Sequence, residues 1–136
     1  MAKRVLVVDD DPPIVRLLRK CLEQQGLEVA TACDGAACLL AIESKRPDLV
    51  ILDVMMPVMD GFQALRVLRE KPETRDLPVI LLTARKEDID VARGWSTGAD
   101  FYLTKPVALD EFVLVVRRIL QMQGPQEAVP TPSGES

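Results

Sequence analysis

Short apolar runs alternate along this chain with longer segments in which apolar residues recur every three or four positions. The short runs are rich in valine, isoleucine and leucine, a composition typical of strands buried on both faces of a sheet. The longer segments have the spacing of helices that bury one face. We therefore expect five strands, each followed by a helix, at residues 4–8, 27–32, 49–52, 79–82 and 101–103.

Local signals indicate where the helices begin and end. Pro12 suits the first turn of the first helix, and Gly26 suits its end. Asp34 and Asp60 are expected to cap the second and third helices, because a carboxylate accepts hydrogen bonds from the free N–H groups of a first turn. Asp11, directly before Pro12, is expected to act as a cap or turn former in the same way. The fourth and fifth helices are expected over residues 87–95 and 109–123.

Five strands alternating with five helices indicate an α/β fold with a doubly wound parallel sheet. The crossovers between parallel strands are right-handed, and the helices cover both faces of the sheet. In such sheets the functional groups lie at the carboxyl ends of the strands. The polar residues that the sequence places there are Asp9, Asp10, Asp11, Asp53, Thr83 and Lys105.

Length and composition indicate one domain. A chain of 136 residues, 48% of them hydrophobic, can build a single core. After residue 123 the composition changes to mostly Gly, Pro, Gln, Glu, Thr and Ser, which is typical of linkers and disordered tails. We therefore assign residues 1–123 to the domain and expect residues 124–136 to be a disordered tail or a linker.

Composition also argues against several classes of function. The chain has no histidine, so the usual general base and the usual zinc ligand are both absent. The net charge of −4 argues against a direct nucleic-acid surface. No run of apolar residues is long enough to span a membrane, and we expect a cytoplasmic protein. Three cysteines are expected to be reduced core residues: Cys21, Cys33 and Cys38.

Three carboxylates are expected to meet at the edge of the sheet, from Asp9, Asp10 and Asp53. Two such charges repel by about 4 kcal/mol at a separation of about 4 Å and an effective dielectric of about 20, so a cation has to compensate. Oxygen ligands with room for water favour Mg²⁺. The ion would also screen the carboxylates from an anionic phosphoryl group, which leaves Asp53 free to act as a nucleophile. Thr83 and Lys105 offer the hydroxyl and the ammonium expected to hold phosphoryl oxygens.

Four stretches of the chain together carry a family resemblance: Val5–Asp11, Leu52–Gly61, Leu82–Arg85 and Gly98–Pro106. In their order and spacing these stretches resemble the signature segments of bacterial two-component response-regulator receivers, over residues 4–121. The resemblance implies a chemotaxis-regulator-like domain with a flavodoxin-like fold and the strand order 2-1-3-4-5.

The resemblance implies a role for each candidate residue. Asp53 would be the phosphorylation site, and Thr83 and Lys105 would contact the phosphoryl group. Thr83 and Tyr102 would form a switch pair, in which the aromatic ring follows the hydroxyl inward and shifts the population between two packings. The Lys105–Pro106 bond would be cis. The implied Mg²⁺ ligands are Asp9 through water, Asp10, Asp53 and the main-chain carbonyl of Met55.

A receiver of this kind is a signalling module that catalyses only its own phosphorylation and dephosphorylation. The implied partners are a sensor histidine kinase or phosphotransfer protein and a downstream effector domain or protein. The output face would be formed by the fourth helix, the fifth strand and the fifth helix. In the winged-helix transcription-factor branch, charged pairs on this face build a symmetric dimer, but the corresponding residues here are Val91, Phe101 and Val115. Leu114 and Val115 are expected to lie outside the core stripe of the fifth helix. With Val91, Trp95 and Phe101 they predict an exposed apolar patch, for which a hetero-partner and a homodimer both stay open.

Two other functions fit the sequence less well. A Mg²⁺-dependent aspartyl phosphatase also uses an aspartate nucleophile, but places it after the first strand in an Asp-x-Asp-x-Thr motif. Here Pro12 follows Asp11, and the chain has no room for the cap region of those enzymes. A phosphorylation-independent interaction module would lack Asp53 or Lys105, and this chain has both. The pattern therefore favours a phospho-receiver.

Overall fold

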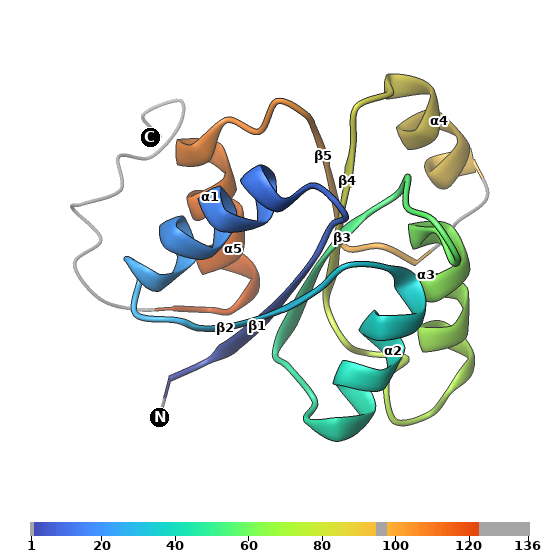
Figure 1. Cartoon of the computed structure of the whole chain (residues 1–136), viewed down its shortest axis with the longest axis horizontal. Helices are drawn as coiled ribbons and strands as arrows, with labels where there is room; N and C mark the ends of the chain where they lie inside the picture. The colour runs from blue at the N-terminus through green and yellow to red at the C-terminus, as the bar shows by residue number, and fades with distance from the viewer. Residues whose placement is uncertain (1, 95–97, 123–136) are drawn as a thin grey trace.

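The computed structural model describes residues 2–94 and 98–122, with the side chains of residues 91–94 left out. In this part of the chain five strands and five helices alternate along the sequence (Figure 1). The elements are β1 (Arg4–Val8), α1 (Pro12–Glu23), β2 (Glu28–Ala32), α2 (Gly35–Ser44), β3 (Leu49–Asp53), α3 (Gly61–Glu70), β4 (Val79–Thr83), α4 (Lys86–Gly94), β5 (Phe101–Thr104) and α5 (Leu109–Ile119).

The strands form one parallel sheet in the order β2-β1-β3-β4-β5, which confirms the expected fold class and strand order. Figure 1 shows α1 and α5 on one side of the sheet and α2, α3 and α4 on the other. Successive side chains of a strand point to opposite faces. In β1, Val5 and Val7 pack with α1 and α5, whereas Leu6 and Val8 pack with α2 and α3. The central strands β1, β3 and β4 are therefore mostly apolar, because both faces of the sheet are covered.

Two of the expected helix caps are confirmed, and the third is wrong. Asp34 accepts a hydrogen bond from the main chain of Ala37, and Asp60 forms a reciprocal capping box with Gln63. Asp11 occupies the cap position of α1, but its side chain makes no cap hydrogen bond. Instead, the Asp11 main-chain N–H donates to the carboxylate of Asp9 at 3.0 Å.

The end of α5 and the position of one cysteine also differ from expectation. Helix α5 ends at Ile119 and not near residue 123, since Gln121 has a φ of 54° that no helix continues through. Cys21 and Cys38 are buried as expected, but Cys33 is exposed because it lies after the end of β2, directly before the helix cap Asp34. Burial raises the pKa of the Cys38 thiol to about 12, and the charge of Asp34 adds to the rise.

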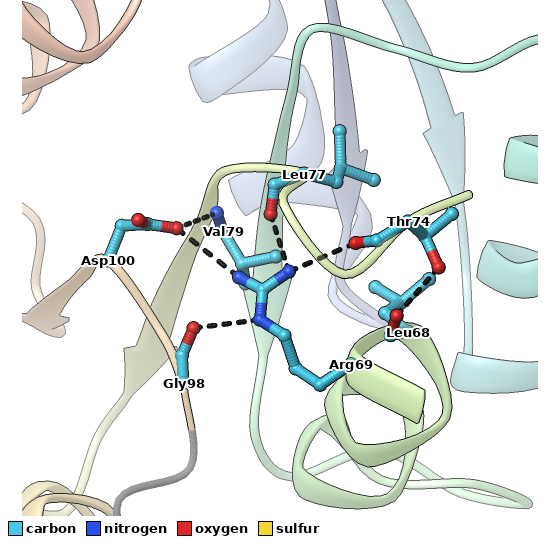
Figure 2. Close-up of polar contacts among 7 residues, drawn as sticks. All are labelled: Leu68, Arg69, Thr74, Leu77, Val79, Gly98 and Asp100. Atoms are coloured by element: carbon cyan, nitrogen blue, oxygen red, sulfur yellow. Dashed lines mark hydrogen bonds and ion pairs between the residues drawn. The ribbon is translucent and has the colours of Figure 1, made fainter. Parts of the chain in front are cut away.

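The side chain of Arg69 joins α3 to two segments that are distant in sequence (Figure 2). Its Nε donates to the carbonyl of Gly98 at 2.9 Å, and its Nη1 donates to that of Leu77 at 2.7 Å. Its Nη2 lies 3.3 Å from a carboxylate oxygen of Asp100, which also accepts from the main-chain N–H of Val79 at 2.8 Å. Arg69 therefore fixes the chain before β4 and the chain before β5 to the same helix.

Candidate functional site

The carboxyl ends of four strands bring the expected polar residues to one edge of the sheet. Asp9 follows β1, Asp53 is the last residue of β3, Thr83 is the last of β4, and Lys105 follows β5. The ammonium of Lys105 lies 2.9 Å from Oδ2 of Asp9 and 3.1 Å from Oδ1 of Asp53. The Lys105–Pro106 bond is cis, as expected. Segments far apart in the sequence thus converge on one ion-pair cluster.

The two carboxylates next to Lys105 are almost completely buried, Asp9 at 2% and Asp53 at 3% exposure. The pKa of Asp53 is raised to about 6, first by burial and then by the nearby Asp9 carboxylate, while Lys105 opposes the rise. Burial lowers the pKa of Lys105, but the charges of Asp9 and Asp53 outweigh burial, and its pKa is raised overall. A negative charge on Asp53 is therefore unfavourable in this site without further positive charge.

The carboxylates of Asp9, Asp10 and Asp53 each place an oxygen within 4.8 Å of the others, a spacing suited to a metal ion. Oδ2 of Asp9 is buried and has no aligned hydrogen-bond donor within the described part of the chain. The ammonium of Lys105 is close enough for an ion pair with it, but the angles are not those of a hydrogen bond. Three carboxylates beside a single ammonium keep an excess of negative charge, which fits a hard cation such as Mg²⁺.

The loop between β3 and α3 folds closely over the end of β3. The main-chain N–H of Gly61 donates to the carbonyl of Val54 at 2.9 Å. A Cβ atom at Gly61 would collide with the carbonyl oxygen of Asp53, so this position needs glycine. Met55, two residues after Asp53, has its side chain turned to solvent at 57% exposure. The ligand role of its main-chain carbonyl stays a prediction.

The main-chain conformation of Val58, in the same loop, leads to a prediction about stability. Its φ of 69° is a left-handed conformation, which costs a β-branched residue about 1–2 kcal/mol, and its side chain is 83% exposed. Val58→Gly should raise the free energy of unfolding by about 0.5 kcal/mol, after the greater freedom of glycine in the unfolded chain is subtracted. Urea unfolding measures it, with Val58→Ala as the control. Equal stability of the glycine and alanine variants would contradict the strain.

Thr83 is buried, and its hydroxyl is hydrogen-bonded to α4. It donates a hydrogen bond of 2.8 Å to Oδ2 of Asp88 in the first turn of α4. The sequence analysis did not identify Asp88, because Asp88 and its neighbour Glu87 are equivalent acids at the start of a predicted helix. Tyr102, the other expected switch residue, is half-buried against the cluster of α2 and α3.

The expected apolar patch lies partly within the described structure. Phe101 is exposed at 38%, whereas Val115 is half-buried and packs against the core, contrary to its expected position outside the core stripe. The side chain of Val91 and the whole of Trp95 lie outside the described residues. A shallow hollow with a volume of about 130 Å³ lies on this face, and its lining is formed by Phe101, Leu114, Val115, Arg118 and Ile119.

A family model described as the response regulator receiver domain matches residues 5–117 of the chain. The chain belongs to this family. The receiver domain is 42% identical to Response regulator MprA of Mycobacterium sp. (strain KMS) over 133 residues, which cover 98% of this chain and 57% of MprA. It is 40% identical over 135 residues to the alkaline phosphatase synthesis transcriptional regulatory protein PhoP of Bacillus subtilis (strain 168), covering 99% of this chain and 54% of PhoP. The chain thus spans just over half the length of these relatives.

Solved structures agree with this assignment. The signal receiver domain of a signal transduction histidine kinase from Syntrophus aciditrophicus is 37% identical, with a TM-score of 0.82 over 88% of this chain and 91% of that one. Chemotaxis response regulator CheY4 of Vibrio cholerae is 31% identical, with a TM-score of 0.80 over 88% of this receiver domain and 99% of that chain. None of the helices in the described ranges has the length and apolarity needed to cross a bilayer.

Proposed function

We propose that this receiver domain accepts a phosphoryl group on Asp53 from a sensor histidine kinase or phosphotransfer protein. The observation that carries the proposal is the contact of Lys105 with Asp9 and Asp53 within a cluster of three carboxylates. A buried carboxylate next to an ammonium and two further acids is the arrangement that phosphoryl transfer to a carboxylate needs.

In the proposed reaction a carboxylate oxygen of Asp53 attacks the phosphorus atom of a phosphohistidine. The new O–P bond forms as the N–P bond breaks, and the electron pair of that bond stays with the imidazole that leaves. Lys105 binds an oxygen of the transferred group and neutralises part of its charge. Asp9, Asp10, Asp53 and the main-chain carbonyl of Met55 would hold Mg²⁺, which supplies further positive charge at the site when bound.

The signal would leave through Thr83 and Tyr102. The Thr83 hydroxyl turns toward the phosphoryl group, the Tyr102 ring follows, and the face of α4, β5 and α5 changes its packing. Phe101 and Val115 on that face, together with Val91 and Trp95, would contact an effector or a second copy of the chain. In this account the chain is a signalling module, and its chemistry is limited to gaining and losing its own phosphoryl group.

The greater length of the curated relatives supports a division of the chain into a receiver and a linker. Because MprA and PhoP are almost twice as long as the matched region, we propose residues 1–123 as the receiver and residues 124–136 as a tail or linker. A cytoplasmic location, no direct nucleic-acid contact by this domain and no membrane contact remain predictions from composition.

Acetyl phosphate, a small phosphoryl donor, tests the proposed reaction without the kinase. Intact-mass measurement should show one added phosphoryl group in the presence of Mg²⁺ and none after Mg²⁺ is chelated. Asp53→Asn should show none in either condition, since an amide is a poor nucleophile and forms no acyl phosphate. Asp11→Asn is the matched control, because its exposed side chain lies outside the three-carboxylate cluster. Full labelling of Asp53→Asn would refute the assignment.

Mg²⁺ is expected to stabilise the folded receiver, because a cation relieves the repulsion among Asp9, Asp10 and Asp53 that the unfolded chain lacks. At a Mg²⁺ concentration about 100 times its Kd, the gain should be about 2.7 kcal/mol, measured as a rise in Tm. Asp10→Ala should raise Tm without Mg²⁺ and abolish the Mg²⁺ response, whereas Asp11→Ala should retain the response. An Asp10→Ala response equal to that of the wild type would contradict the proposed ligand set.

A further inference from the structure

The hydroxyl that would bind the phosphoryl group already has a strong partner. Thr83 donates to Oδ2 of Asp88 at 2.8 Å, and its own Oγ1 accepts from the main-chain N–H of Arg85 at 3.0 Å. A more distant acceptor, the carbonyl of Arg85, lies at 3.4 Å. A hydroxyl has a single proton to donate. Thr83 therefore has to release Asp88 before it donates fully to a phosphoryl oxygen.

Asp88 is placed so that this hydrogen bond is strong. The residue is 8% exposed and lies in the first turn of α4, where the helix dipole favours a negative charge. Its ion-pair partner, Nε of Arg85, is 3.7 Å from the same Oδ2, and the side chain of Arg85 is 57% exposed. The bond from Thr83 is thus the shortest polar contact that the described structure shows for this carboxylate. Charge-assisted bonds of this kind are about twice as strong as neutral ones.

We propose that Asp88 is a positioning residue that holds Thr83 in its unphosphorylated orientation and competes with the phosphoryl group for the Thr83 hydroxyl. The inference rests on the proposed phosphorylation of Asp53. When the hydroxyl turns toward the phosphoryl oxygens, the Asp88 carboxylate loses its short hydrogen bond. A buried carboxylate has to replace that bond, so the first turn of α4 moves toward Arg85 or water. One hydrogen-bond exchange then links the phosphorylation site to α4 directly.

Beryllofluoride with Mg²⁺ is a suitable probe, because it adds to a carboxylate oxygen and imitates a phosphoryl group. Calorimetric titration should show that Asp88→Ala binds it about tenfold more tightly than the wild type, the equivalent of one charge-assisted hydrogen bond. Asp88→Asn keeps the shape of the side chain and a neutral acceptor, so its affinity for beryllofluoride should lie between those of the wild type and Asp88→Ala. This variant provides the test if the alanine variant does not fold. Glu87→Ala removes the same charge from the same helical turn, and its affinity should equal that of the wild type.

A double-mutant cycle separates the competition from a general effect of charge. In a Thr83→Ala background no hydroxyl is left to compete for, so adding Asp88→Ala should leave the affinity unchanged. The main-chain N–H of Arg85 gives an independent signal, because it donates to Oγ1 of Thr83. In ligand-free Asp88→Ala its NMR chemical shift should move toward its position in the wild type bound to beryllofluoride.

The outcomes distinguish this inference from the proposed function. If the wild type binds beryllofluoride but Asp88→Ala and Asp88→Asn bind it no more tightly than Glu87→Ala, the competition is refuted and phosphorylation of Asp53 stands. The same conclusion follows if Asp88→Ala tightens binding by the same factor in the Thr83→Ala background as in the wild type. If the wild type fails to bind, or Asp53→Asn binds as well as the wild type, the proposed function itself fails, and this inference fails with it.

Discussion

Lys105→Met is expected to lower the free energy of unfolding by about 3 kcal/mol in Mg²⁺-free buffer. The ammonium lies 2.9 Å from Asp9 and 3.1 Å from Asp53, and both carboxylates are nearly inaccessible to water. Methionine replaces the length of the lysine stem but not its charge, so two buried acids lose their neutralising partner. This loss of stability is at the lower end of the range expected for breaking a buried ion pair, because Asp53, with a pKa of about 6, can take up a proton instead.

Mg²⁺ should reverse most of this loss, since a divalent ion at the three carboxylates replaces the missing positive charge. Urea unfolding with and without Mg²⁺ measures both effects. Lys86→Met, the same change at an exposed lysine of α4, should alter stability by less than about 0.5 kcal/mol in either buffer. A Lys105→Met variant as stable as Lys86→Met in Mg²⁺-free buffer would contradict the charge balance described for the site.

Arg69→Met should destabilise the domain by about 3 kcal/mol. The guanidinium of Arg69, whose side chain is 18% exposed, donates to the carbonyls of Leu77 and Gly98 and pairs with Asp100 (Figure 2). Methionine fills similar space but offers no donor, so all three acceptors lose their charged partner. Arg69→Lys should lose most of the same stability, because an ammonium cannot replace a planar fork that reaches acceptors in three directions.

Arg66→Met is the matched control, since Arg66 is exposed on the same helix about one turn earlier. Urea unfolding gives the stability difference, and amide hydrogen exchange shows where it acts. The N–H of Val79 donates to Asp100, so its exchange should accelerate in Arg69→Met more than that of a central β1 amide such as Leu6. Equal stability of the Arg69 and Arg66 variants would refute the role assigned to this contact.

The architecture was predictable because its signals are local and repeated. Each of the three central strands is a short apolar run, which is typical of a sheet covered on both faces, and the order of elements then places the strand ends together. That reasoning was sufficient to expect Asp9, Asp53 and Lys105 at one edge, where the structure places them. Their chemical roles, by contrast, follow from the family resemblance and from the proposed reaction.

Contacts that depend on three-dimensional detail were missed. Arg69 has the spacing of an ordinary surface arginine, and its acceptor Gly98 is 29 residues away in sequence. Asp88 differs from Glu87 only in the direction of its side chain, which no periodicity reveals. The missing cap bond at Asp11 has a similar cause, because such a bond depends on the direction of the Asp11 side chain. Side-chain direction was thus the missing information in each case.

The most direct test of the account is to locate the phosphoryl group on the chain. Borohydride reduces an aspartyl phosphate to homoserine, which marks the modified residue permanently for peptide sequencing by mass spectrometry. After treatment with acetyl phosphate and Mg²⁺, the account predicts homoserine at position 53 and at no other aspartate. Homoserine at Asp9, Asp10 or Asp11, or no homoserine in a sample whose intact mass shows phosphorylation, would contradict it.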